Sequence, residues 1–375
     1  MRLPQHLLAS PLFVFKNAEE LIGAMGDRST PEAIGDIRTL SAQGLPPVVS
    51  EEALAAMVGI NSGLVWSFLN RTWKHYRTFE IPKGNGVRQI NAPRVALKIV
   101  QKWLSVNLAK FYEAPEHVFG FVAGRSHIDA AMRHIGAKWA FSADISDFFP
   151  STPEAMVAEA LQTIGYSDQS SRIIARLGCL GGRLAQGAPT SPLFSNLCFR
   201  QMDSAVLELS HKYECRLTRY ADDLVFSGQG DFPNTIRDDL TALFANGPWH
   251  LAPQKMLVQP LKGRIKVHGL LVNDSGVRLT RGYRNQIRAY AHLLATRGDQ
   301  AMEAPKLIGH VEHARHVQRV TGSPSGISKN EGVERERIII PPGIILPDRQ
   351  PSADDRRPEA QNESFVGWLK RILNF

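Results

Sequence analysis

The sequence predicts an α+β fold, in which an antiparallel sheet is covered by helices, and three observations favour it. Asn85-Gly86 lies between two short strand-like runs, and this dipeptide is a strong signal for a tight hairpin. Ala221-Asp222-Asp223 lies between two further strand-like runs and predicts a second hairpin. Residues 95–108 and 281–297 instead repeat apolar side chains at helical spacing. Hairpins give antiparallel strands, and antiparallel sheets that occur with helices are typical of α+β proteins.

Helices are predicted at the N-terminus, and strands and helices follow each other after it. Ser50 precedes two glutamates, which is typical of a helix start, and predicts a helix over residues 51–58. Apolar runs predict strands over residues 78–82, 87–91, 139–145, 216–220, 224–227, 267–272 and 277–279. Helical spacing predicts helices over residues 95–108, 153–164, 170–180, 193–210, 281–297 and 305–320. Residues 181–192, rich in Gly and Pro, predict a loop.

The C-terminal residues differ in composition from the rest. Residues 322–362 are rich in Pro, Gly, Ser and charge and predict a linker with one apolar piece. Residues 365–375 predict an amphipathic helix that docks on the chain's own surface, with contact to a partner or a membrane as the alternative.

The positive charge of the chain is concentrated in two segments. The 375 residues carry 44 Lys and Arg against 36 Asp and Glu, a net charge of +8. Residues 71–103 hold eight Lys or Arg and one acid, and residues 261–290 hold seven and one. Two basic segments in an otherwise mildly acidic chain indicate two contact surfaces for a polyanion. The alternative, a pair of solvated basic helices, stays open on charge alone.

Cysteine usage and hydropathy favour a cytoplasmic protein without a membrane anchor. Cys179, Cys198 and Cys215 lie far apart and fit neither a zinc-ligand spacing nor a disulfide framework. Residues 7–15 are apolar, but Pro11 interrupts them and no small-residue cleavage site follows, so no signal peptide is predicted. No apolar run approaches the roughly 18 residues of a membrane span.

Three carboxylates in two separate motifs form a candidate metal site. Asp144 lies near the end of the predicted strand 139–145, and Asp222 and Asp223 lie at the tip of the second hairpin. Clustered at one sheet edge, their oxygens suit two hard cations such as Mg²⁺, which clamp the attacking and leaving oxygens of a phosphoryl transfer. Ordinary turn chemistry for the Asp-Asp pair and a helix cap for the nearby Asp147 are the alternatives.

A loop between the two acidic motifs is a candidate nucleotide site. Residues 185–192 read Ala-Gln-Gly-Ala-Pro-Thr-Ser-Pro. Gly187 permits close approach of the backbone, and the Gln186 amide can bond to a base or sugar edge. Alone, this string is a loop with a helix start. Between the acidic motifs it is predicted to lie under an incoming nucleotide and its template base.

In this order the motifs resemble those of reverse transcriptases. The chain carries Tyr-Ala-Asp-Asp at 220–223, preceded by Gln-Gly-Ala-Pro-Thr-Ser-Pro at 186–192 and Asp-Ile-Ser-Asp-Phe-Phe-Pro-Ser at 144–151. Four further segments are similar to motifs of bacterial retron reverse transcriptases: residues 76–83, 119–126, 254–255 and 267–273. The resemblance covers roughly residues 45–320. The chain departs from the retron pattern at Val267-His268-Gly269, where Val-Thr-Gly is typical, and in lacking an Asn shortly before His134.

The resemblance implies a right-hand polymerase with fingers, palm and helical thumb. The implied division is an N-terminal helical region (1–70), fingers with part of the palm (71–135), palm (136–275), thumb (276–321), and a linker with an amphipathic helix (322–375).

The resemblance also implies roles for single residues. Asp144, Asp222 and Asp223 match the catalytic carboxylates, which bind metal together with the backbone carbonyl of Ile145. The residues matched to the dNTP are Lys83, Arg88, Phe149, Gln186 and Lys255, of which Phe149 is the aromatic gate against a ribose 2′-hydroxyl. The residues matched to primer and template are Tyr220, Gly269 and Leu270. Two alternatives to these roles stay open. One of Phe148 and Phe149 is expected to pack in the core, and Lys255 can be a solvated lysine of a loop.

Three histidines, His310, His313 and His316, are spaced three apart on the predicted helix 305–320. Such spacing places neighbours on one helix face, where they could bind metal. No Cys or further His partner is suggested, and a thumb helix along a duplex backbone is the preferred interpretation.

By resemblance, the function is RNA-directed DNA polymerisation with two Mg²⁺ ions, or Mn²⁺ as a substitute. The implied partners are dNTPs, a structured non-coding RNA that serves as template and primer, and its RNA-linked single-stranded DNA product. A toxin or effector protein in anti-phage defence and a host ribonuclease H are implied as well, and no membrane. The alternatives are another defence-associated reverse transcriptase, which can lack a template, a group II intron-like enzyme, and a catalytically silent RNA-binding protein. Intact carboxylates argue against the last, because clustered acids repel a phosphate chain unless metal neutralises them.

Overall fold

The computed structural model of the chain describes residues 5–83, 86–260, 265–297 and 304–322, and it confirms the α+β class. Its main sheet is antiparallel, with β7 (Asp223–Gly228) between β6 (Arg216–Tyr220) and β3 (Trp139–Ser146). The far edge of β3 pairs first with β9 (Leu257–Pro260) and then with β8 (His250–Leu251).

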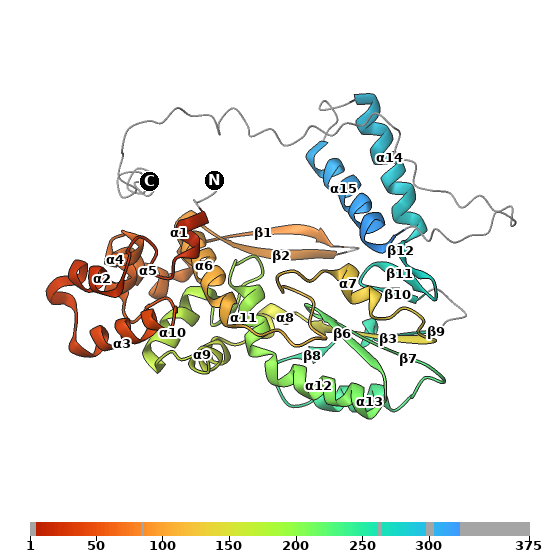
Figure 1. The fold of residues 1–375 in the computed structure, drawn as a ribbon, viewed down its shortest axis with the longest axis horizontal. Coiled ribbons are helices and arrows are strands. Elements are labelled where there is room, and N and C mark those ends of the chain that lie inside the picture. The colour runs from red at the N-terminus through yellow and green to blue at the C-terminus, as the bar shows by residue number, and fades with distance from the viewer. Residues whose placement is uncertain (1–4, 84–85, 261–264, 298–303, 323–375) are drawn as a thin grey trace, which may run out of the picture.

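The main sheet separates two of the three cores, because successive side chains of a strand point to opposite faces. On one face, Phe141 and Phe226 pack against α12 (Arg200–Lys212) and α13 (Ile236–Leu243). On the other face, Ala140 and Val225 join a core shared with the C-terminal elements. Figure 1 shows α12 and α13 below the sheet and the C-terminal helix pair above it.

The C-terminal elements form a small sheet with two long helices. The strands are β10 (Ile265–Val267), β11 (Leu270–Asn273) and β12 (Gly276–Leu279), and the helices are α14 (Arg281–Arg297) and α15 (Ala304–Thr321). The prediction of one strand over residues 267–272 was wrong. His268 and Gly269 have φ of 46° and 87° and turn the chain into a hairpin, in which Val267 pairs with Leu270.

The third core holds the N-terminal helices, of which α4 (Glu51–Val58) begins as predicted. The Ser50 hydroxyl caps α4 by accepting a hydrogen bond from the Ala53 amide at 3.1 Å. The other N-terminal helices are α1 (Gln5–Ala9), α2 (Ala18–Met25), α3 (Pro31–Ala42) and α5 (Ser62–Asn70). They pack with α6 (Val95–Leu108), α9 (Glu154–Gln162), α10 (Asp168–Gly178) and α11 (Ser191–Cys198).

A two-stranded hairpin leaves this N-terminal core. It consists of β1 (Tyr76–Lys83) and β2 (Gly86–Pro93), and it reaches across the molecule toward the C-terminal elements (Figure 1). Short elements fill the rest: η1 (Gly26–Arg28), η2 (Thr72–His75), η3 (Ala109–Phe111), α7 (His127–Met132), α8 (Phe148–Ser151), β4 (Cys179–Leu180), β5 (Arg183–Leu184) and η4 (Pro253–Lys255).

The single helix predicted over residues 193–210 is instead two helices, α11 and α12, which meet at Phe199. Phe199 is fully buried and packs edge-on against Phe148 and Trp249. The break has a tertiary cause, since these contacts come from residues distant in sequence, and no Gly or Pro at this point announces it.

Two predictions fall on parts of the chain that are only partly described. The linker and C-terminal amphipathic helix lie outside the described residues, apart from position 322. The Asn85-Gly86 turn signal has only Gly86 described, although Lys83 and Gly86 pair as a hairpin predicts. Among the described helices, none combines the length and hydropathy needed to span a membrane.

Candidate active site

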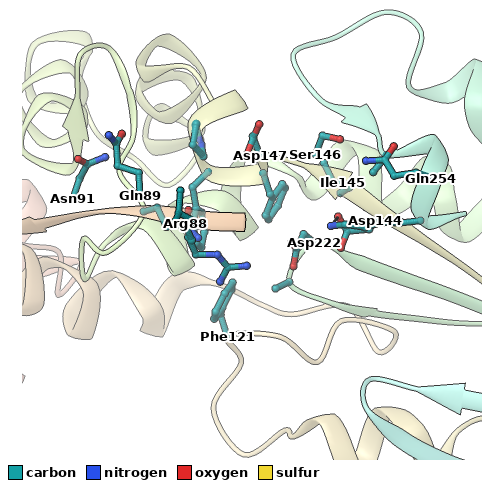
Figure 2. A pocket seen from close by; sticks show the side chains of 18 residues that line it. Arg88, Gln89, Asn91, Phe121, Asp144, Ile145, Ser146, Asp147, Asp222 and Gln254 are labelled. Carbon is teal, nitrogen blue, oxygen red and sulfur yellow. Dashed lines mark hydrogen bonds and ion pairs between the residues drawn. The ribbon is translucent and has the colours of Figure 1, made fainter. Parts of the chain in front are cut away.

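A cavity of about 610 Å³ lies where the β1–β2 hairpin approaches the end of the main sheet. Its walls come from β2, the end of β3, α8, η4, the β6–β7 turn and the segments that carry Phe121 and Gln186. Seven predicted site residues line it: Arg88, Asp144, Ile145, Phe149, Gln186, Asp222 and Lys255. Figure 2 shows Arg88 on one side of this space and Asp144 and Asp222 on the other.

The register of the sheet brings the acidic motifs together. Asp144 pairs with Asp223 across β3 and β7, and the Ile145 amide donates a hydrogen bond to the Asp222 carbonyl at 2.8 Å. Burial and next the charge of Asp144 raise the pKa of the Asp222 carboxyl above its usual 3.8. The charged form of Asp222 is therefore disfavoured unless a cation lies beside it.

The ammonium group of Lys255 is one cation near Asp222. It forms a hydrogen-bonded ion pair with Asp144 and also opposes the upward shift in the pKa of Asp222. Among the described residues, no three His, Cys, Asp or Glu side chains form a ready-made metal site. The pair Asp144 and Asp222 nevertheless fits Mg²⁺, which is usually held by one or two carboxylates while water and substrate phosphates complete its shell.

The two aromatic residues after Asp147 differ in burial. Phe148 is buried in the core against Phe199, Phe149 is only partly buried, and both residues line the cavity. The prediction that one of the pair faces the core is confirmed. The ring of Phe149 lies 5.8 Å from that of Phe121, so the cavity has an aromatic wall on this side.

The predicted loop joins the hairpin to the cavity. The Gln186 carbonyl accepts a hydrogen bond from the Asn91 amide of β2 at 2.8 Å. Gly187 has a φ of 123°, and a Cβ there would lie 3.0 Å from the Asn91 carbonyl oxygen. The close approach that Gly187 permits is thus to strand β2. Lys83 ends β1, but its side chain lies outside the described part of the structure.

The residues matched to primer and template lie beside the carboxylates, outside the lining of the cavity. Tyr220 ends β6, and its ring lies 5.6 Å from that of His268. Gly269 is in the β10–β11 turn. Leu270 is 2% exposed and packs in the core under α14 and α15, which leaves its backbone rather than its side chain for contacts.

A buried arginine supports the turn that carries Asp222. Ala221 has a φ of 59°, a strained conformation for a residue with a Cβ. The Arg219 guanidinium donates to the Ala221 carbonyl at 3.1 Å and to both carboxylate oxygens of Asp203 at 2.6 and 2.7 Å. Arg219 and Asp203 are 0% and 1% exposed. This pair holds the strained turn from the core side.

Gly120 packs closely against the same turn. The Phe119 amide donates to the Arg219 carbonyl at 2.8 Å, which brings the following residue, Gly120, against the turn. A Cβ on Gly120 would lie 2.1 Å from the Ala221 nitrogen. No side chain fits here.

Several cavity residues had no assigned role in the sequence interpretation. Asp147 occupies the N-cap position of α8 but makes no side-chain cap bond, so its interpretation as a helix cap was wrong, and it lines the cavity. The other additional polar residues are Gln89, Asn91, Ser146 and Gln254. Arg88 and Gln89 are consecutive residues of β2 and both line the cavity, so the alternation of side chains along a strand gave no signal for Gln89 and Asn91.

The histidines of α15 contact other side chains. His310 Nδ1 lies 2.9 Å from the Tyr283 hydroxyl, and the ring of His313 lies 5.2 Å from that of His127. Within the described residues no metal-binding group includes them.

Comparisons with known proteins agree with this geometry. Residues 81–250 match the family described as reverse transcriptase (RNA-dependent DNA polymerase). The chain is 30% identical over 322 residues to the retron Mx65 reverse transcriptase of Myxococcus xanthus, covering 77% of this chain and 73% of that one. It is 31% identical over 290 residues to the retron Mx162 reverse transcriptase of the same organism, covering 67% and 60%.

Among solved structures, a telomerase from Candida albicans in complex with a fragment of telomeric RNA aligns with a TM-score of 0.40 at 12% identity, over 78% of this chain and 67% of that one. The mixed helix-and-sheet architecture and the matched family agree with the right-hand polymerase fold that the motifs implied. The chain belongs to the reverse transcriptases of retron type, which are RNA-directed DNA polymerases.

Proposed function

We propose that this enzyme copies a dedicated structured non-coding RNA into single-stranded DNA that stays joined to the RNA. The observation that carries the chemistry is the cavity in which Asp144 and Asp222 face Arg88 (Figure 2). This arrangement suits a dNTP. The carboxylates can hold a cation at the α-phosphate, where the reaction takes place, and the guanidinium can donate two parallel hydrogen bonds to phosphate oxygens. The likeness to retron reverse transcriptases supports the choice of template.

The residues on the substrate side bind and select the nucleotide. Arg88 binds phosphate oxygens with a planar fork, and Lys83, five residues away on the same hairpin, adds a second charge. Phe149 closes the sugar side, where its ring excludes a ribose 2′-hydroxyl and thereby favours deoxynucleotides. Gln186 bonds to the base or sugar edge from the adjacent loop.

The carboxylate side carries the chemistry. A 2′- or 3′-hydroxyl of the primer attacks the α-phosphate. The new O–P bond forms as the bond from the α-phosphorus to the bridging oxygen breaks, the hydroxyl proton is released to water, and pyrophosphate leaves. Asp144, Asp222 and the Ile145 carbonyl, with Asp223 beside them, would hold Mg²⁺, or Mn²⁺ as a substitute, and the cation would offset the negative charge on the phosphate oxygens. Lys255 lies at the same wall of the cavity, where its ammonium donates a proton to the leaving pyrophosphate or stabilises its negative charge.

The larger elements hold the primer–template. We propose that the β1–β2 hairpin acts as fingers, the main sheet as palm, and α14 with α15 as thumb. The two basic segments include β1–β2 and the β10–β12 sheet, on either side of the acidic site in sequence. An RNA–DNA hybrid between them is held by shape and phosphate contacts, with the Tyr220 and Gly269 region at the primer.

The biological setting is a further part of this proposal. We propose that the protein acts in a cytoplasmic anti-phage system with an effector protein, and that a host ribonuclease H removes copied RNA; the similarity to retron reverse transcriptases supports this proposal. Its three free cysteines suit a reducing compartment.

Two experiments test the proposal. Purified protein should incorporate dNTPs in a Mg²⁺-dependent manner on its copurifying RNA, and Asp222→Asn should reduce the rate at least about a hundredfold. Full activity of that variant contradicts the assignment of the site. Sequencing of the copurifying nucleic acid should give RNA joined to single-stranded DNA of fixed sequence. DNA of variable sequence without a linked RNA would instead identify a template-independent defence enzyme.

A further inference from the structure

The β10–β11 turn places a residue with a Cβ at a positive φ. Two-residue turns with positive φ at both central positions prefer Asn or Asp followed by Gly. Here the first position is His268, with a φ of 46°, and the second is Gly269. The position is also where the retron pattern typically has Thr. Positive φ is uncommon for a residue other than glycine, although His is among the types that adopt it more readily, so the contacts of the His268 side chain are worth following.

The side chain of His268 is directed at a catalytic motif. It is 3% exposed, and its Nδ1 lies 2.9 Å from Oδ2 of Asp223. Its other nitrogen, Nε2, lies 3.2 Å from the hydroxyl of Thr218 on β6. The imidazole therefore bridges β6, at the edge of the main sheet, and the last carboxylate of the Tyr-Ala-Asp-Asp motif.

The network continues into the core. The Thr218 hydroxyl lies 2.7 Å from Nε2 of His134, and Nδ1 of His134 lies 2.6 Å from the Ser227 hydroxyl. Thr218, His134 and Ser227 are all fully buried. Burial, with a smaller effect from His268, lowers the pKa of His134 to about 3, so its ring is neutral under ordinary conditions.

The partners determine which way the protons point. An ionised carboxylate only accepts hydrogen bonds, so His268 donates to Asp223 from Nδ1. In the tautomer that carries this Nδ1–H, Nε2 of His268 accepts from Thr218, Thr218 accepts from His134, and His134 accepts from Ser227. All four hydrogen bonds run in one direction, from Ser227 to Asp223, and every group finds its partner. Such chains polarise each of their members and give a fixed orientation.

We propose that His268 is a positioning residue that fixes the Asp223 carboxylate for the polymerase reaction. Its Nδ1–H occupies Oδ2 of Asp223, which leaves Oδ1 as the oxygen available to a cation at the site. Asp223 is 34% exposed and needs such a tether, because an exposed carboxylate otherwise samples several rotamers. This inference rests on the proposed function, in which Asp223 lies beside the catalytic cation.

Two substitutions separate the hydrogen bond from the bulk of the ring. In His268→Asn the side-chain amide places an N–H near the position of Nδ1, and Asn is favoured at this turn position. In His268→Phe the ring volume stays, but the donor is lost. The exposed His211 near the end of α12 provides the control His211→Asn, which removes a histidine far from the network.

The readouts are Mn²⁺ binding, followed by the EPR signal of the free ion, and steady-state dNTP incorporation as a function of Mg²⁺. Loss of a group that orients a metal ligand typically costs about tenfold or more in metal affinity or rate. We expect His268→Phe to weaken Mn²⁺ binding and lower kcat by about that factor, with the KM for dNTP unchanged. His268→Asn should stay within about threefold of the wild type in both measurements, and the control should match the wild type.

Unchanged Mn²⁺ affinity and kcat in His268→Phe would overturn the inference, as would equal losses in the Phe and Asn variants, which indicate a purely structural role. Failure of the proposed function gives a different pattern. In that case Asp222→Asn retains the wild-type rate, whereas the Mn²⁺ titrations of the two His268 variants still report on the tether.

Discussion

The buried pair of Arg219 and Asp203 makes a quantitative test of how the catalytic turn is held. The perturbation is Asp203→Asn, which keeps the shape of the side chain and removes its charge. In the wild type Asp203 accepts two hydrogen bonds from Arg219, at 2.6 and 2.7 Å, with both side chains inaccessible to water. The substitution leaves Arg219 as a buried cation without a counter-charge.

The magnitude follows from that burial. Removing one partner of a buried ion pair typically costs about 3–5 kcal/mol, because the remaining charge keeps its desolvation penalty. A folded domain has about 5–15 kcal/mol in total, so the variant should fold but denature at much lower urea. Replacing both residues by apolar ones of similar size, Arg219→Met with Asp203→Leu, should cost less than either single change, because no buried charge remains.

The assay is urea unfolding followed by tryptophan fluorescence, since Trp249 packs on Phe199 beside the guanidinium. Glu19→Gln is the matched control. Glu19 accepts from Arg38 at 2.8 Å in an ion pair that is exposed on both sides, and its loss should leave the unfolding midpoint unchanged. A change of less than about 1 kcal/mol in Asp203→Asn would contradict the expected cost of an unpaired buried charge, because it would mean that Arg219 finds water or another partner.

Three other substitutions test the turn and the cavity. Gly120→Ala should lower dNTP incorporation by about tenfold or more and destabilise the protein by about 1–3 kcal/mol, since its Cβ would meet the Ala221 nitrogen; Gly23→Ala, where nothing lies within 4 Å, is the control. A lower melting temperature with unchanged dNTP incorporation would mean that Gly120 matters for stability but not for the position of Asp222. Phe149→Ala should reduce discrimination against ribonucleotides by about tenfold, measured as the ratio of kcat/KM for dNTP and rNTP, and an unchanged ratio argues against the gate. Asp222→Asn should raise the melting temperature of the metal-free protein at neutral pH. The pKa of the Asp222 carboxyl is raised from 3.8 on folding. Ionised Asp222 therefore lowers the free energy of unfolding above the raised pKa and has no effect below 3.8, where it is protonated in both states. The variant should lose this part of the pH dependence of stability. The same pH profile in both proteins would contradict the cause given for the shift.

Much of the fold could be predicted because its signals are local. Helix α6 and helix α14 have the bounds that their apolar spacing predicted, and α4 begins at the predicted serine cap. The β6–β7 hairpin forms around Asp222 as its turn residues predicted. Each of these features depends on residues within a few positions of one another, so their periodicity and turn chemistry are visible in one chain.

Other features depend on contacts that no local pattern records. The break at Phe199 follows from packing against Phe148 and Trp249, and the split of residues 267–272 follows from a histidine in a left-handed conformation. A residue with a Cβ is uncommon at positive φ, and His268 adopts it here with its side chain bonded to Asp223 and Thr218 on the main sheet.

The polymerase motifs and their order are readable in the amino-acid sequence, and with them the three candidate carboxylates Asp144, Asp222 and Asp223. Tertiary contacts were needed for the register that pairs Asp144 with Asp223, for the cavity wall at Arg88, and for the hydrogen bonds from Arg219 and His268. The difference lies in the distance along the chain over which each feature is set. A motif is fixed by neighbours in the chain, whereas the orientation of a buried carboxylate is fixed by hydrogen bonds from strands and helices tens of residues away, whose pairing is chosen by the packing of the whole core.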